Sequence, residues 1–192
     1  MKSEISSAEL ELLKLLAVEF ERLGFRWYVM GAQAALFHGA QRSTNDIDIT
    51  VLDALNRRAE LVGLLRSVGC TLRVDDDDFH ARTRVIPAQL SEGLGLDVVL
   101  GADPLEEQFA ARAARVEVDG VSLNIASAED VIVMKLLAGR PRDLGDVSEV
   151  VRAARALDLK YLRGLLALLE EGLGRDDLLE PLEHALRAYN GT

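Results

Sequence analysis

The chain has 192 residues, of which 49% are hydrophobic, and a formal net charge of −10 at pH 7. This content suffices for one good core with a helical appendage, while the negative charge argues against a protein that grips nucleic acid with its whole surface. The single Cys70 cannot form an intrachain disulfide, the first residues are charged rather than apolar, and no apolar run approaches the roughly 20 residues needed to cross a bilayer. We therefore expect a cytoplasmic protein without a membrane role.

The pattern of apolar residues predicts an α+β fold. A first helix opens with the capping pair Ser6 and Glu9 and ends at Gly24. Strands are predicted at 25–30, 46–51, 70–74, 82–87 and 95–100, with a helix at about 53–68, and the dipeptide Asp119-Gly120 predicts a hairpin of strands 115–118 and 121–125. Further helices are predicted at 127–138, 142–157, 159–171 and 176–189. We expect a mixed β-sheet core covered by helices over residues 1–126, and an α-helical region packed on it over 127–192.

Two aspartates alternate with apolar residues in the second predicted strand. Asp46 and Asp48 are two positions apart, so both carboxylates leave the strand on the same face, roughly 7 Å apart along it. Mg²⁺ would relieve their repulsion, because it favours one or two carboxylates together with phosphate oxygens and water. An isolated Asp-x-Asp is weak evidence in a chain with sixteen aspartates, and the run Asp75 to Asp78 is interpreted as a solvated loop between strands.

Two features beside this strand favour a metal or phosphate site. Gly31 ends a β-rich run at the start of an alanine-rich helical turn, where backbone N–H groups can receive phosphate, although tight packing of a helix on a strand explains it equally well. Asp97 lies in an otherwise apolar strand, where an ionised carboxylate is costly unless it is paired or bound to metal. The alternative for Asp97 is an edge strand that faces water.

Two groups of cationic and hydroxyl side chains add to the pattern. Arg42, Ser43 and Thr44 precede the acidic pair, and a guanidinium with two hydroxyls suits an anionic ligand, although a solvated loop has the same composition. Lys135 falls in the last turns of an apolar helix that opens at Ser127. The alternative for Lys135 is a favourable interaction of its charge with the end of the helix.

The order of these motifs resembles the DNA polymerase beta nucleotidyltransferase superfamily, and most closely the abortive-infection type nucleotidyltransferase toxins of bacterial toxin-antitoxin systems. The resemblance covers roughly residues 25 to 150 and rests on Gly31-Ala32, Arg42-x-Thr44-x-Asp46-x-Asp48, Asp97, the Glu129-Asp130 helix with Lys135, and Arg140-x-Arg142-Asp143-x-x-Asp146. Since each motif alone is weak, it is their order that is specific.

The resemblance implies a set of site residues. It implies that Asp46, Asp48 and Asp97 bind two Mg²⁺ ions and that a nucleoside triphosphate lies over Gly31 and Ala32. In the toxin branch, the residues that match Lys135 and Asp143 or Asp146 also belong to the active site. One departure is visible, because the superfamily usually has Gly-Ser where this chain has Gly31-Ala32. A hydroxyl contact to the triphosphate is therefore missing unless Ser43 or Thr44 replaces it.

The implied reaction is in-line transfer of a nucleoside monophosphate from a nucleoside triphosphate to an acceptor hydroxyl, with two metal ions assisting. An RNA end such as that of tRNA, a protein side chain and a small molecule such as an antibiotic are all compatible acceptors, and an antitoxin is a possible partner. Two alternatives belong to other classes. One is a nucleotide-binding or regulatory module with weak catalysis, and the other is a partner protein that acts through its acidic surface.

Overall fold

The strands form one mixed sheet. The computed structural model describes residues 5–41, 46–90, 93–154 and 156–190, and within them seven strands follow the order β3-β4-β5-β2-β1-β7-β6. Strand β2 is parallel to β5 and antiparallel to β1, and β1 is parallel to β7. The strands are β1 (Trp27–Met30), β2 (Asp46–Leu52), β3 (Thr71–Leu72), β4 (Val85–Gln89), β5 (Gly95–Gly101), β6 (Ala114–Val118) and β7 (Val121–Ile125). The predicted α+β class with a mixed sheet is confirmed.

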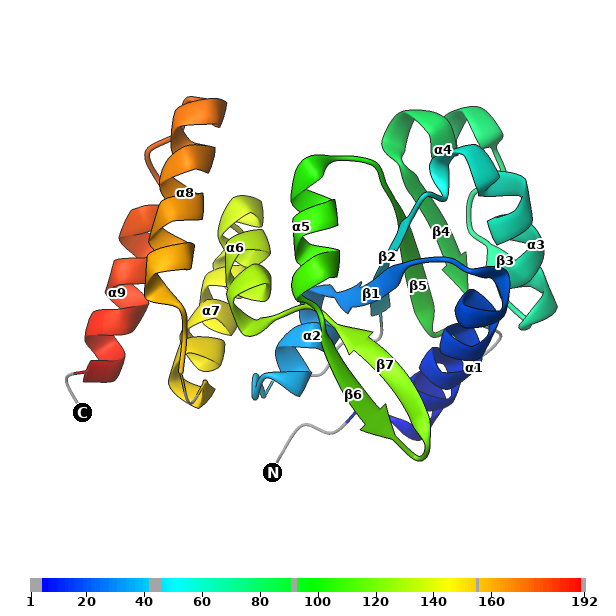
Figure 1. The fold of residues 1–192 in the computed structure, drawn as a ribbon, viewed down its shortest axis with the longest axis horizontal. Helices are drawn as coiled ribbons and strands as arrows, with labels where there is room; N and C mark the ends of the chain where they lie inside the picture. The colour runs from blue at the N-terminus through cyan, green and yellow to red at the C-terminus, as the bar shows by residue number, and fades with distance from the viewer. Residues whose placement is uncertain (1–4, 42–45, 91–92, 155, 191–192) are drawn as a thin grey trace.

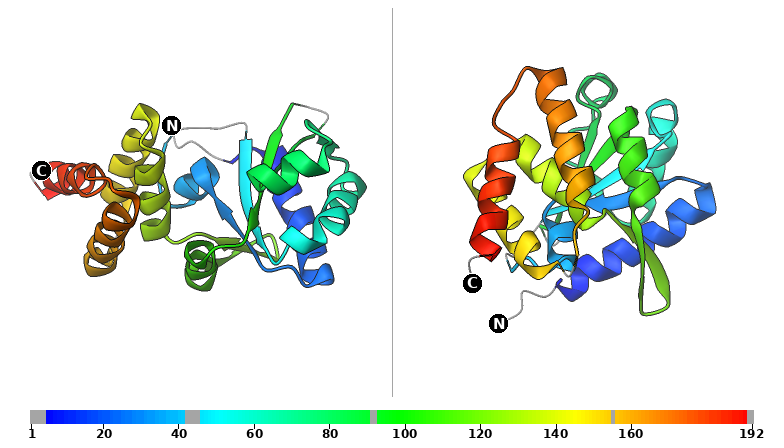
Figure 2. Two further views of the ribbon diagram at one scale, coloured as in Figure 1. Left: turned by 90° about the horizontal axis from the view of Figure 1, so that it is seen from above. Right: turned by 60° about the vertical axis from the view of Figure 1, so that its left-hand side comes forward.

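Helices lie on both faces of the sheet (Figures 1 and 2). Helices α1 and α3 lie on one face, while α2 and the C-terminal helices α6 to α9 lie on the other (Figure 2). Helix α2 contacts both β2 and α6, so it links the sheet to the C-terminal helices. The helices are α1 (Ser7–Leu23), α2 (Gly31–Phe37), α3 (Arg58–Ser67), α4 (Asp77–Thr83), α5 (Pro104–Arg112), α6 (Ala128–Ala138), α7 (Pro141–Ala153), α8 (Leu159–Leu173) and α9 (Leu179–Asn190), with a short 3₁₀ turn at Leu55–Arg57.

Strand β2 carries the alternation that its sequence predicts. Ile47, Ile49 and Val51 are fully buried in the core, while Asp46 and Asp48, which alternate with them, lie on the opposite face. Helix α1 begins as expected, because the Ser6 hydroxyl accepts from the backbone N–H of Glu9 and the Glu9 carboxylate accepts from that of Ser6. These two elements place an apolar layer behind the carboxylates of β2.

Helices α4 and α5 differ from the secondary structure that the sequence predicts. Residues 82–87 were expected to form a strand, but α4 runs to Thr83 and β4 begins only at Val85. The acidic run is therefore not simply a loop: the Asp76 carboxylate accepts from the backbone N–H of Phe79, and the acidic residues that follow favour the positive end of the helix. Helix α5 was not predicted, although Asp103 and Glu106 form a capping box around Pro104.

The C-terminal helices are joined to the core by a polar cluster. The Asp130 carboxylate is fully buried and accepts from Arg112 Nε at 3.2 Å and from the Tyr161 hydroxyl at 2.6 Å. The Arg112 guanidinium also lies 3.8 Å from the centre of the Tyr161 ring. The cluster fixes α5, α6 and α8 to one another. A domain boundary between residues 126 and 127 stays a prediction, and none of the helices in the described ranges is long and apolar enough to span a membrane.

Candidate active site

The three candidate metal-binding carboxylates line one cavity. Asp46 and Asp48 lie on β2, Asp97 lies on the adjacent parallel β5, and Asp48 is directly opposite Asp97 in the strand register. The cavity has a volume of about 690 Å³, within the range of small-molecule sites. The opposite wall comes from α6 and α7, including Lys135 and Asp143. The sheet and the C-terminal helices thus enclose the carboxylates together.

Gly31 lies directly against Asp48. Its φ angle is +66°, and a Cβ atom at this position would lie 2.0 Å from Asp48 Oδ2. The Asp48 carboxylate also accepts a hydrogen bond from the backbone N–H of Ala32, at the start of α2, where no side chain of the preceding residue caps the helix. Both the backbone angle and the contact therefore require glycine at residue 31.

The Asp48 carboxyl has a perturbed pKa. Burial raises this pKa to about 6, and the negative charges of Asp97 and Asp46 act in the same direction, while the Lys135 charge and the Ala32 hydrogen bond lower it. A carboxylate that is disfavoured by burial and by neighbouring negative charge is stabilised by an added cation. The charge distribution in the cavity thus suits a positively charged ligand beside Asp48.

Lys135 forms a buried charge cluster with α7. Its Nζ lies 3.1 Å from Asp143 Oδ1 and 2.6 Å from Asp146 Oδ2, and all three residues are less than 10% exposed. Arg140 Nε lies 3.0 Å from the second oxygen of Asp143. Lys135 is therefore paired across two helices in addition to lying near the end of its own helix. Its role in the reaction stays a prediction.

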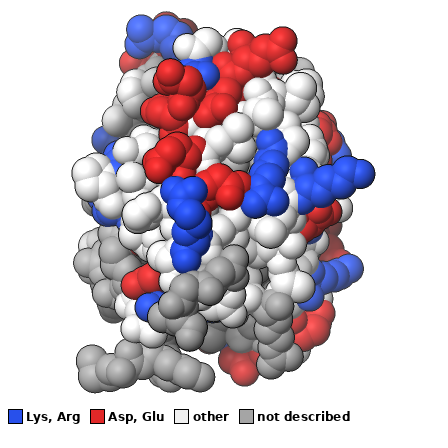
Figure 3. Space-filling view, turned by 90° about the vertical axis from the view of Figure 1, so that its left-hand side faces the viewer, with Lys and Arg blue, Asp and Glu red and all other residues white. Residues whose placement is uncertain are grey.

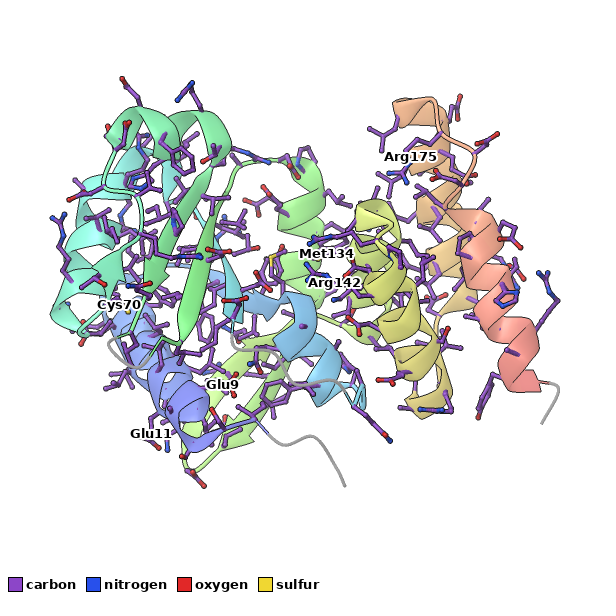
Figure 4. All side chains as sticks on the ribbon, turned by 180° about the vertical axis from the view of Figure 1, so that it is seen from behind. Glu9, Glu11, Cys70, Met134, Arg142 and Arg175 are labelled. Atoms are coloured by element: carbon purple, nitrogen blue, oxygen red, sulfur yellow. The ribbon has the colours of Figure 1, made fainter. Side chains whose placement is uncertain are left out.

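The mouth of the cavity carries further cations. Arg140 and Arg142 both line it, and both are exposed. Figure 4 shows Met134 and Arg142 on the side of α6 and α7 that faces the sheet. On the face seen in Figure 3, basic and acidic side chains are interspersed. The predicted phosphate contacts Arg42, Ser43 and Thr44 lie outside the described residues.

Sequence reasoning missed Arg73, which contacts a carboxylate that lines the cavity. Its Nη2 donates to Asp97 Oδ1. The two residues are 24 positions apart, and their contact depends on the register of β3, β4 and β5, which no local pattern in the sequence reveals. Arg73 is thus the direct ionic partner of one candidate metal ligand.

The donor chemistry fits Mg²⁺. Asp46, Asp48 and Asp97 supply the hard oxygen ligands that Mg²⁺ prefers, and the raised pKa of Asp48 shows the electrostatic cost that a cation would relieve. In the part of the chain that the structure describes, however, no three acidic, histidine or cysteine side chains are already grouped so that they could hold a metal ion.

Comparison with known proteins identifies the family. Residues 10–171 match the family described as "Nucleotidyltransferase of unknown function (DUF6036)". No curated protein sequence matches the chain.

Solved structures share the fold at low sequence identity. An antigenic nucleotidyltransferase-like protein from Paracoccidioides brasiliensis is 19% identical with a TM-score of 0.56, over 93% of this chain and 94% of that chain. The lincomycin-bound lincosamide antibiotic adenylyltransferase LnuA is 16% identical with a TM-score of 0.55, over 78% and 99%. The antibiotic-resistance factor ANT(2'')-Ia is 18% identical with a TM-score of 0.51, over 97% and 94%. With the family match over most of its length, the chain belongs to this family of nucleotidyltransferases, within the nucleotidyltransferase superfamily.

Proposed function

We propose that the protein is a Mg²⁺-dependent enzyme that transfers a nucleoside monophosphate from a nucleoside triphosphate to an acceptor hydroxyl. The observation that carries this proposal is the shared cavity, in which three carboxylates from two adjacent parallel strands face cationic side chains from α6 and α7. The cations suit the triphosphate, and the carboxylates suit the metal ions that accompany it. In this reaction the acceptor oxygen attacks the α-phosphorus and pyrophosphate leaves.

The side chains of the cavity have separate tasks in this proposal. Asp46, Asp48 and Asp97 would hold two Mg²⁺ ions, which when bound activate the attacking oxygen and neutralise charge on the leaving phosphates. The absence of a side chain at Gly31 keeps the Asp48 carboxylate against the start of α2. Lys135 adds a cation on the opposite wall of the cavity, where its two carboxylate partners hold it in place.

The test is a labelling experiment. Each labelled nucleoside triphosphate is incubated with the protein, Mg²⁺ and a cell extract, and labelled RNA, protein and small molecules are separated. Asp48→Asn should reduce transfer by about 100-fold or more, because metal ions contribute several kcal/mol to such reactions. Asp177→Asn is a matched control, since Asp177 is exposed and pairs with Arg175 outside the cavity. Equal activity of the wild type and Asp48→Asn would contradict the proposal.

The acceptor could be an RNA end such as that of tRNA, a protein side chain or a small molecule. The sequence resemblance to the abortive-infection type toxins supports an RNA acceptor and a role as the toxin of a toxin-antitoxin pair. The names of two fold relatives, an antibiotic adenylyltransferase and an antibiotic-resistance factor, support an antibiotic instead. Expression of the wild type should arrest growth in the first case, with relief by Asp48→Asn or by an antitoxin, and should confer drug resistance in the second.

Ala32 supports a second candidate function, a nucleotide-binding or regulatory module with weak catalysis. Where the superfamily usually has serine, this chain has a methyl group at Ala32, which lines the cavity and is 8% exposed. In this case calorimetry would detect Mg²⁺-dependent binding of a nucleoside triphosphate without pyrophosphate release. Ala32→Ser should then raise turnover, whereas it should add little to an enzyme that already obtains its hydroxyl contact from Ser43 or Thr44.

A further inference from the structure

Arg73 and two of the candidate metal ligands, Asp48 and Asp97, form one row across the sheet. Asp48 on β2 is directly opposite Asp97 on β5, and Asp97 is directly opposite Pro87 on β4. The backbone N–H of Arg73, just after β3, donates to the Pro87 carbonyl at 2.8 Å, which extends the pairing of β3 with β4. Residues in register on neighbouring strands project from the same face of a sheet. The Arg73 side chain therefore extends over the compact ring of Pro87 to the Asp97 carboxylate.

Two contacts hold the segment that follows Arg73. The Val74 carbonyl accepts a hydrogen bond from Nε2 of His80 at 2.8 Å, and His80 is only 2% exposed. Arg66 Nη2 lies 2.6 Å from Asp75 Oδ2. The guanidinium of Arg73 is thus held beside Asp97 by a backbone that is paired with β4 just before Arg73 and anchored by these two contacts just after it.

The Arg73–Asp97 ion pair involves a carboxylate that the proposed metal ions need as a ligand. Arg73 Nη2 donates to Asp97 Oδ1, and the two side chains are 38% and 36% exposed, so the pair is partly accessible to solvent. The negative charge of Asp97 acts on Asp48, whose pKa it raises, so the two carboxylates belong to one electrostatic unit. The Arg73 guanidinium and a divalent cation would compete for the Asp97 oxygens. Because both are positively charged, they would also repel each other.

We propose that Arg73 is an internal counter-ion that competes with the divalent metal for Asp97 and thereby sets the metal affinity of the site. The inference rests on the proposed function, because it needs Asp97 to be a metal ligand. Arg73 gives up the Asp97 carboxylate when the metal binds. Removing the guanidinium therefore strengthens metal binding, whereas the loss of a merely structural ion pair leaves metal binding unchanged or weakens it.

The test measures metal binding without turnover. Mn²⁺, a probe that can replace Mg²⁺ at oxygen sites, is titrated into the nucleotide-free full-length protein, and free Mn²⁺ is followed by electron paramagnetic resonance. Arg73→Gln should bind Mn²⁺ about fivefold more tightly than the wild type, the factor expected for a partly exposed ion pair. Arg73→Lys retains the charge without the planar fork and should fall between the two. The matched control is Arg163→Gln, which removes a similarly exposed Arg–Glu pair outside the cavity and should leave the affinity unchanged.

The outcomes separate this inference from the proposed function. If Arg73→Gln binds Mn²⁺ as well as the wild type or less well, while Asp48→Asn abolishes binding, the metal site stands and the role of Arg73 is refuted. If neither the wild type nor any of the variants binds Mn²⁺, both proposals fail. Melting curves recorded for Arg73→Gln and Arg73→Lys ensure that only folded protein is compared.

Discussion

The contact between Gly31 and Asp48 allows a quantitative prediction. Gly31→Ala places a methyl group at a φ of +66°, which costs about 1 kcal/mol for a residue other than glycine. The same methyl group lies 2.0 Å from Oδ2, 2.7 Å from Cγ and 2.9 Å from Cβ of Asp48, and such overpacking costs about 1 to 3 kcal/mol. The free energy of unfolding should therefore fall by about 2 to 4 kcal/mol. If the Asp48 carboxylate instead rotates away from the methyl group, the loss of stability should be smaller and the loss of affinity for the metal larger.

Gly24 provides the matched control for this substitution. It has a similar φ of +69°, but a Cβ atom there would meet no other atom within 4 Å. Gly24→Ala should thus lose only the conformational part, about 1 kcal/mol, and retain metal binding. Urea unfolding and Mn²⁺ titration of both variants measure the two effects. A Gly31→Ala variant that is as stable as Gly24→Ala and still binds Mn²⁺ like the wild type would refute the close approach of Gly31 to Asp48.

Three further predictions concern charge and stability. Folding raises the pKa of Asp48 from 3.8 to about 6, so its contribution to stability is complete below pH 3.8 and is lost as the pH rises through 6. Between pH 5 and pH 7.5, the melting temperature of the metal-free protein should therefore fall by more than the melting temperature of Asp48→Asn does. Lys135→Met removes the Nζ cation from the buried carboxylates of Asp143 and Asp146 and should cost about 3 kcal/mol in urea unfolding, with partial recovery in the double variant with Asp146→Asn. Full stability of the single variant would exclude the buried cluster. Tyr161→Phe removes the 2.6 Å hydrogen bond to buried Asp130 and should lower the free energy of unfolding by about 1.5 to 3 kcal/mol. The affinity for Mn²⁺ should not change. A change in that affinity would link the polar cluster around Asp130 to the candidate active site.

The fold and the main motifs could be predicted because each depends on neighbours in the sequence. The alternation around Asp48 identifies both the strand and its acidic face. Gly31 marks the transition from β1 to α2, and the two capping residues of α1 predict its start within a few residues. The misassigned α4 shows the limit of this reasoning, since an acidic run suits a solvated loop and the first turn of a helix equally well.

Contacts between distant segments could not be predicted in this way. The pair Arg73–Asp97 requires the order of β3, β4 and β5 in the sheet, and β3 comprises only two residues. Asp130 lies in the first turn of α6, and nothing in the sequence connects it with Arg112 or Tyr161, which lie 18 and 31 positions away. Such residues become visible only when the register of the sheet and the packing of the helices are known.

Several polar and charged groups of the cavity already have partners within the protein, and this has a consequence for ligand binding. Asp97 is paired with Arg73, Asp48 accepts from the backbone of Ala32, and Lys135 is held by carboxylates of α7. In the proposed reaction a metal ion and a triphosphate would each replace some of these partners, so each ligand alone would bind with reduced affinity. When the metal occupies the carboxylates, the cations of the cavity become available to bind the phosphates. By linkage, the bound triphosphate should then raise the affinity for the metal by the same factor. Mn²⁺ should therefore bind more tightly in the presence of a nucleoside triphosphate, beyond the affinity of the free nucleotide for the ion.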